Sequence, residues 1–124
     1  MRWLFPVLVL LSMAALFLPT GGGTSPLPDK VIHMIIFGGL AGTGFLAGFR
    51  IDRLVGGLLA YAVTSEILQG LLPIHRSADW RDAIADACGI AIGLAAGYVV
   101  GRITGGSAGS LALASRAGTP EPRR

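Results

Sequence analysis

The sequence predicts an all-α membrane protein, an up-down bundle of four transmembrane helices with a flexible C-terminal tail. Apolar residues make up 52% of the 124 residues and charged residues only 14%, whereas charged residues are about 25% of an average soluble protein. The mean hydropathy is +0.68. Four apolar runs, each near the length of about 20 residues that crosses a bilayer, follow one another between short polar segments. Glycines are concentrated inside these runs, as is common in membrane helices.

The first apolar run covers residues 3–18 and follows Met1 and Arg2. A basic residue before an apolar run also occurs in secretory signal peptides. This run is long for the core of a signal peptide, however, and no A-x-A cleavage site precedes the glycines that follow it. We therefore expect an uncleaved first transmembrane helix.

A second helix is expected over residues 30–49. Residues 19–28 contain prolines, glycines, serine and threonine, which predicts a loop, and Asp29 stands where an N-cap residue is expected. The helix is rich in small residues, among them Gly38 and Gly42, which allow another helix to approach closely.

The third helix is expected over residues 54–72, ending before Pro73, and the fourth over residues 82–101. Glycines recur every four residues in the fourth helix, at Gly89, Gly93, Gly97 and Gly101. This spacing forms a stripe against which a neighbouring helix of the bundle can pack. The alternative use of the stripe is contact with a second chain, which would give a homo-oligomer.

These helices form one domain over residues 1–103, and residues 104–124 are predicted to be a disordered cytoplasmic tail because apolar periodicity is lost there. With alternating helix directions, most basic residues lie on the side of the two termini. That side holds Arg2, Arg50, Arg53, Arg102, Arg116, Arg123 and Arg124, and the other side holds Lys30, Arg76 and Arg81. The positive-inside rule therefore predicts a multi-pass protein of the cell membrane with cytoplasmic termini.

The net charge of +3 does not indicate nucleic-acid binding, because the arginines fall mostly at the ends of apolar runs and form no basic stripe. Membrane lipid is the expected partner instead. Cys88 is the only cysteine, which excludes a disulfide within the chain. Its position in an apolar run predicts a packing role.

Ionisable side chains from three of the expected helices lie at a similar depth near the outer face. At 1.5 Å per residue, His33 lies about 5 Å inside its helix, Glu66 about 9 Å and Asp86 about 6 Å. Glu66 is the hardest to explain structurally, because a carboxylate within an apolar helix, near its C-terminal end, must be protonated or paired. We therefore predict a binding cluster. Its residues are Asp29, Lys30, His33, Glu66, Gln69, Arg76, Asp82 and Asp86.

Recognition of a polar or ionic group from outside the cell is the favoured use of this cluster, because intramembrane ionisable residues tend to mark functional sites. Three basic residues would surround the acidic centre: Lys30, Arg76 and Arg81. The structural alternative is an ion pair that only locks the helices together.

Two chemical alternatives are less favoured. An enzyme would use Glu66 or His33 as a general base, but no serine nucleophile motif is present. A metal site lacks the tight His/Cys motif that would fix its geometry, so no metal ion or cofactor is predicted. Its ligands would be His33, Glu66, Asp82 and Asp86.

Three segments, in this order, resemble the VanZ-like family of small integral membrane proteins. Residues 29–41 (DKVIHMIIFGGLA) resemble the family's D-K-x-x-H-x-x-x-F opening of a helix. Residues 66–82 (EILQGLLPIHRSADWRD) resemble its E-x-x-Q segment, which leads through a proline and an arginine to an acidic pair. Residues 82–93 (DAIADACGIAIG) resemble its D-(aliphatic)-x-x-N-x-x-G-x-x-x-G pattern.

The resemblance implies an integral membrane protein and marks positions that correspond to Asp29, Lys30, His33, Glu66, Gln69, Arg76, Asp82 and Gly89. Asp86 stands where the family has asparagine. Because an ionised carboxylate only accepts hydrogen bonds, Asp86 must be protonated or gain a basic partner, either Arg81 or His33.

The namesake of this family is associated with low-level resistance to the glycopeptide antibiotic teicoplanin. Together with the depth of the ionisable groups near the outer face, this favours a non-enzymatic protein of the cell envelope whose ligand is a lipid headgroup, a cell-wall precursor or a glycopeptide. A binding protein is favoured over an enzyme that acts on a lipid-linked substrate and over a purely structural membrane subunit.

Overall fold

The computed structural model describes residues 3–17, 28–73 and 79–117, and these residues form four α-helices. The helices are α1 (Leu4–Phe17), α2 (Asp29–Leu46), α3 (Ile51–Leu71) and α4 (Trp80–Ala117). The prediction of an all-α protein is confirmed. By length and composition α2, α3 and α4 can each cross a membrane. The helix α1 is apolar but has 14 residues, about 21 Å at 1.5 Å per residue, and residue 18 of the expected first helix lies outside the described residues.

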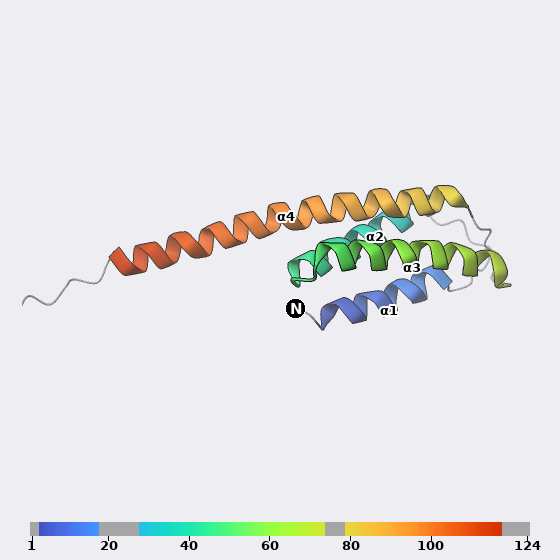
Figure 1. Cartoon of the computed structure of the whole chain (residues 1–124), viewed down its shortest axis with the longest axis horizontal. Coiled ribbons are helices and arrows are strands. Elements are labelled where there is room, and N and C mark those ends of the chain that lie inside the picture. Colours follow the sequence, from blue (N-terminus) through green and yellow to red (C-terminus); the bar gives the residue numbers. More distant parts are fainter. Residues whose placement is uncertain (1–2, 18–27, 74–78, 118–124) are drawn as a thin grey trace, which may run out of the picture.

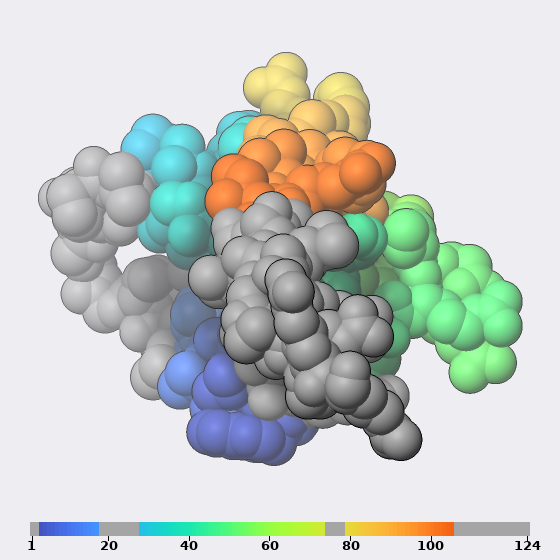
Figure 2. Space-filling model, turned by 90° about the vertical axis from the view of Figure 1, so that its left-hand side faces the viewer, coloured from blue at the N-terminus to red at the C-terminus, as the bar shows by residue number. Residues whose placement is uncertain are grey.

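Consecutive helices run in opposite directions in Figure 1, so α2 and α4 are parallel to each other and antiparallel to α1 and α3. Viewed from the end at which α4 projects, α4 lies at the top, α1 at the bottom, and α2 and α3 on opposite sides (Figure 2). The helix α2 contacts all three other helices. It therefore provides the surface on which the rest of the fold is assembled.

Gly48 sets the end of α2. Among the described residues it is the one glycine with a positive φ, which is 78°. The N–H of Gly48 donates to the carbonyl of Phe45, and the N–H of Phe49 donates to that of Gly44. This pair of bonds is a Schellman motif, which requires one residue in the left-handed conformation. Glycine adopts this conformation without steric cost. The helix therefore ends at Leu46, three residues earlier than the sequence predicts.

The start of α4 is set by Asp79, whose Oδ1 accepts a hydrogen bond of 3.0 Å from the N–H of Arg81. This is the contact that an N-cap carboxylate makes with the second residue of a helix, and it begins α4 at Trp80 instead of residue 82. The prediction that Asp29 caps the second helix is wrong. Asp29 is the first residue of α2, and Pro28 occupies the N-cap position without a side-chain cap.

The predicted start of the tail at residue 104 is wrong, because α4 continues to Ala117 and projects past the other helices (Figure 1). Residues 104–117 contain no proline and several alanines and leucines, which have high helix propensity. The rest of the expected tail, residues 118–124, lies outside the described residues.

The glycine stripe of α4 packs against the backbone of α2 in the same chain. A Cβ atom added at Gly89 would overlap the backbone of Met34, and one added at Gly93 would overlap the carbonyl of Gly38. A Cβ atom at Gly42 would lie 3.1 Å from the carbonyl oxygen of Gly93. The helices are in direct backbone contact here, so a second chain could use this part of the stripe only by displacing α2.

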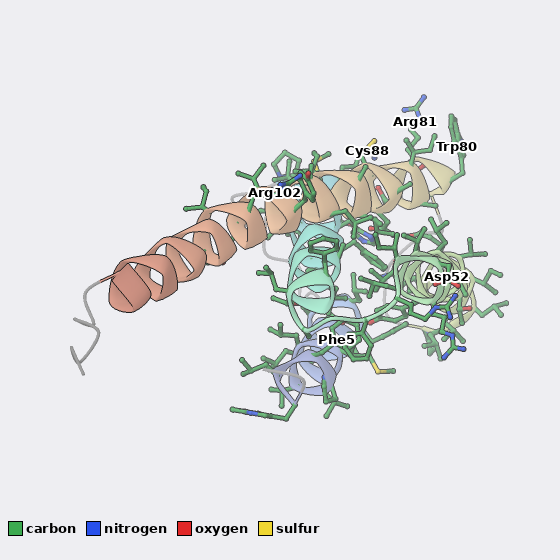
Figure 3. All side chains as sticks on the ribbon, turned by 60° about the vertical axis from the view of Figure 1, so that its left-hand side comes forward. Phe5, Asp52, Trp80, Arg81, Cys88 and Arg102 are labelled. Atoms are coloured by element: carbon green, nitrogen blue, oxygen red, sulfur yellow. The ribbon has the colours of Figure 1, made fainter. Side chains whose placement is uncertain are left out.

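The core lies along the middle of the bundle and draws on all four helices. Its buried apolar residues are Leu16, Phe37, Leu40, Ala41, Leu54, Leu58, Ala62 and Ile90. Many large apolar side chains point outward, such as Leu10, Ile67 and Ile92, which suits a surrounding of lipid. Cys88 is also exposed, on the outer face of α4 (Figure 3), so the predicted packing role for its thiol is wrong.

Candidate functional site

Six of the eight residues predicted to form a cluster gather at the end of the bundle where α2 and α4 begin and α3 ends (Figure 1). Because α2 and α4 are parallel and α3 is antiparallel to them, one level of the bundle receives side chains from all three. His33, Glu66 and Asp86 each place a possible ligand atom within 4.8 Å of the other two. The three residues that the sequence predicts to share one depth are therefore also close to one another.

His33 is the centre of this arrangement. Its Nδ1 atom lies 3.0 Å from Oδ1 of Asp86 and 3.8 Å from Oε1 of Glu66. His33 and Asp86 are fully buried, and Glu66 is 7% exposed. His33 is thus the basic partner that the carboxylate of Asp86 needs. Arg81 does not take this role, because its exposed side chain lies over the ring of Trp80, with 5.7 Å from its guanidinium carbon to the ring centroid.

A second group of charged side chains lies beside this cluster, nearer the surface of the bundle. The Nζ atom of Lys30 lies 3.1 Å from Oδ2 of Asp79 and 3.3 Å from Oδ1 of Asp82. The N–H of Arg81, and then the Lys30 ammonium, hold the pKa of Asp79 below its usual value. Asp82 is buried at 5% exposure, so Lys30 neutralises a carboxylate that points into the bundle.

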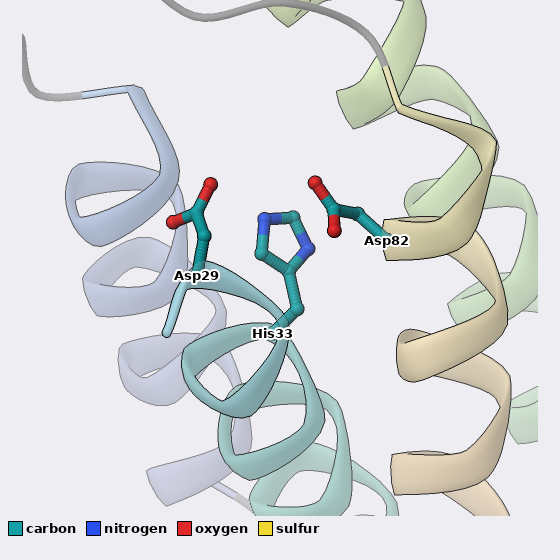
Figure 4. Close-up of side chains that lie close together, drawn as sticks. All are labelled: Asp29, His33 and Asp82. Carbon is teal, nitrogen blue, oxygen red and sulfur yellow. The ribbon is translucent and has the colours of Figure 1, made fainter. Parts of the chain in front are cut away.

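The ring of His33 also stands between the carboxylates of Asp29 and Asp82, which extend from α2 and α4 (Figure 4). Asp29, His33 and Asp82 form a second set whose possible ligand atoms lie within 4.8 Å of one another. His33 therefore belongs to two sets of carboxylates, one buried in the bundle and one nearer the surface.

Two residues of the predicted cluster do not join it in the described structure. Gln69 is 2% exposed, and its Nε2 donates a hydrogen bond of 3.0 Å to the carbonyl of Leu16. It therefore ties α3 to the end of α1. Arg76 lies outside the described residues, as does the neighbouring His75.

One contributor, Asp79, was not among the predicted cluster residues. Its N–H donates a hydrogen bond of 3.1 Å to Oε2 of Glu66, which fixes the orientation of that carboxylate and turns Oε1 toward His33. The sequence signal was its capping position three residues before Asp82. That position predicts the cap of α4 but not the bond to Glu66, because the bond depends on how α3 meets α4.

Three buried polar atoms of the inner cluster make no hydrogen bond to any described residue: Nε2 of His33, Oε1 of Glu66 and Oδ2 of Asp86. Buried polar atoms usually have a partner, so such exceptions mark sites that take up a ligand, an ion or water. One imidazole nitrogen facing two carboxylates can accept or donate a proton, or can bind a metal ion beside them.

Comparison of the chain with protein-family models, with curated proteins and with solved structures finds no match.

Proposed function

We propose that this chain is a VanZ-like integral membrane protein of the cell envelope that binds a cation, or the cationic part of an envelope ligand, in the cluster of His33, Glu66 and Asp86. All four helices would cross the membrane as an up-down bundle. The observation that carries the proposal is the buried excess of acidic groups: two carboxyl groups face one imidazole, and an oxygen of each lacks a hydrogen bond among the described residues. The resemblance to the VanZ-like family supports two of these residues, His33 and Glu66, which correspond to its marked positions, whereas Asp86 stands where that family has asparagine.

The sign of the ligand's charge follows from the basic residues. The sequence predicts Lys30, Arg76 and Arg81 around an acidic centre, which leaves the sign of the ligand's charge open. Lys30 is engaged by Asp79 and Asp82, and the side chain of Arg81 is exposed on Trp80. Positive charge from a ligand therefore suits the inner carboxylates, since a buried anion is costly unless it is paired.

Binding in solution tests the proposal. Purified full-length protein in detergent is titrated with teicoplanin and with lysophosphatidylethanolamine, both of which carry an amine. A hydrogen bond to a charged group contributes about 1.5–3 kcal/mol, so Glu66→Gln and Asp86→Asn are each expected to weaken binding by about 10-fold or more. The matched control is Asp52→Asn, which removes an exposed carboxylate at the opposite end of α3.

Equal binding by Glu66→Gln and the parent protein would contradict the proposal. So would the lack of saturable binding of any cation, organic or metallic, by the parent. Cells that express these variants at equal levels then show whether binding reduces susceptibility to teicoplanin.

A second candidate function is acid/base catalysis on a lipid-linked substrate. The observation that favours it is the bond of 3.0 Å between Nδ1 of His33 and the buried carboxylate of Asp86, because such a carboxylate orients an imidazole and raises its basicity. Turnover of a lipid-linked cell-wall precursor by the parent protein, lost in His33→Ala and kept in Asp52→Asn, would distinguish catalysis from binding.

Labelling of single cysteines tests the orientation proposed from the positive-inside rule. In a Cys88→Ser background, Leu72→Cys at the cluster end of α3 is expected to react with a membrane-impermeant thiol reagent added to intact cells. Asp52→Cys at the other end is expected to react only after the cells are opened. The reverse pattern would place the cluster at the cytoplasmic face.

A further inference from the structure

Building on the proposed function, we propose that the cation is a divalent transition-metal ion bound by Nδ1 of His33, Oε1 of Glu66 and the carboxylate of Asp86. The proposed function allows either an organic ammonium group or a metal ion as the cation. Here the cation is a metal ion. The sequence predicts no metal, because no short motif brings its ligands together. The fold supplies that proximity from three separate helices.

The spacing of the ligand atoms favours a metal ion over an ammonium group. A tetrahedral ion with bonds of about 2.1 Å holds its ligand atoms about 3.4 Å apart. An ammonium group that donates hydrogen bonds of about 2.8 Å to its acceptors would hold them about 4.6 Å apart. The observed distances from Nδ1 of His33 are 3.0 Å to Asp86 and 3.8 Å to Glu66, which lie on either side of the metal value.

The buried atoms without partners supply independent support. A single proton on Nδ1 of His33 can bond to one oxygen, and Asp86 is the nearer acceptor. Oε1 of Glu66 then points at the imidazole from beyond hydrogen-bond distance, and it has no other partner among the described residues. A divalent ion beside a neutral imidazole would bond to this oxygen and balance both carboxylates, which removes the cost of a buried net charge.

The surroundings of the three ligands resemble the outer shell of a metal site. Ligating carboxylates and imidazoles are usually held by further hydrogen bonds or carboxylates. Oε2 of Glu66 accepts the N–H of Asp79, which leaves Oε1 for the ion. The ring of His33 lies between the carboxylates of Asp29 and Asp82 (Figure 4). Its Nε2 atom makes no hydrogen bond to a described residue, so one of these carboxylates would have to move closer to accept a hydrogen bond from Nε2 when Nδ1 binds the ion.

The ligand chemistry indicates the class of metal. An imidazole nitrogen suits zinc, iron, cobalt, nickel and copper, whereas magnesium and calcium prefer sites made entirely of oxygen atoms. One imidazole with two carboxylates is therefore expected to select a first-row divalent transition metal over magnesium or calcium.

Titration of full-length protein, first treated with chelator and kept in detergent, tests the proposal. The probes are Zn²⁺, followed by calorimetry, and Co²⁺, followed by its visible d–d absorption. The parent is expected to bind a single ion per chain, with intense absorption from a low-symmetry Co²⁺ site that contains nitrogen. Loss of an outer-shell partner alone weakens binding about 10- to 100-fold, so Glu66→Gln and His33→Ala are expected to lose at least as much. Asp52→Asn should bind like the parent.

Thermal unfolding distinguishes a variant that has lost the metal site from a variant that fails to fold. Zn²⁺ is expected to raise the unfolding temperature of the parent and of Asp52→Asn but not that of Glu66→Gln, whose amide nearly matches the carboxylate in shape. Equal Zn²⁺ affinity in Glu66→Gln and the parent would overturn the metal site. Saturable binding of teicoplanin or lysophosphatidylethanolamine by a parent that binds no Zn²⁺ would also overturn it, while leaving the proposed function standing. Zn²⁺ binding without either organic ligand would uphold the metal site and remove those ligands from the proposed function.

Discussion

Replacement of Gly93 by alanine is expected to lower the free energy of unfolding by about 1–3 kcal/mol, the usual cost of overpacking a close contact. The added Cβ atom would overlap the carbonyl oxygen of Gly38 on α2, which belongs to helical backbone and cannot rotate away as a side chain would. The two helices would have to separate along the whole α2–α4 contact. Unfolding of the purified protein in detergent, by heat or by titration with a denaturing detergent, measures the loss.

The matched controls are Gly39→Ala on α2 and Gly56→Ala on α3. A Cβ atom at either position meets nothing within 4 Å among the described residues. Alanine is favoured over glycine in a helix by about 1 kcal/mol, so both controls are expected to be neutral or stabilising. An unfolding midpoint for Gly93→Ala at or above those of the two controls would contradict the backbone contact between α2 and α4.

The glycine stripe shows what a sequence pattern can predict about packing. A period of four along α4 places Gly89 and Gly93 on one face, and that alone predicts a close helix neighbour. Several helices of the chain contain glycines, so the pattern does not say that the partner is α2 or that the two helices run parallel. The predicted end of α2 is too late, because the apolar Phe49 follows Gly48 and only the positive φ of Gly48 reveals the Schellman turn.

The sequence predicts the depth at which the residues of the candidate site lie, but it does not predict which of their atoms are in contact. The rise of 1.5 Å per residue is enough to place His33, Glu66 and Asp86 at one level. Which atoms meet there depends on the rotation of each helix about its own axis. That rotation turns Gln69 toward the carbonyl of Leu16 on α1 and brings Lys30 to carboxylates on the α4 side of the cluster. The local sequence does not predict these pairings.

Replacement of His33 by leucine is expected to lower the free energy of unfolding by about 3–5 kcal/mol, the usual cost of breaking a buried ion pair. The change leaves the fully buried carboxylate of Asp86, and the nearby carboxylate of Glu66, without their shared imidazole. Asp86→Ala is expected to cost less, because His33 still faces Glu66. Chelator-treated protein in detergent is the sample for these measurements, so that metal binding does not contribute.

A double-mutant cycle separates the pair from the packing of either side chain. The double variant His33→Leu/Asp86→Ala is expected to lose less stability than the sum of the single variants, with a coupling of about 0.5–3 kcal/mol. The matched cycle uses Arg50 and Asp52, which form an exposed ion pair of 3.1 Å outside the bundle. Exposed pairs contribute about 0–1 kcal/mol, so that coupling should be smaller. Equal coupling in the two cycles would mean that His33 and Asp86 share no buried interaction, because burial is the physical difference between the pairs.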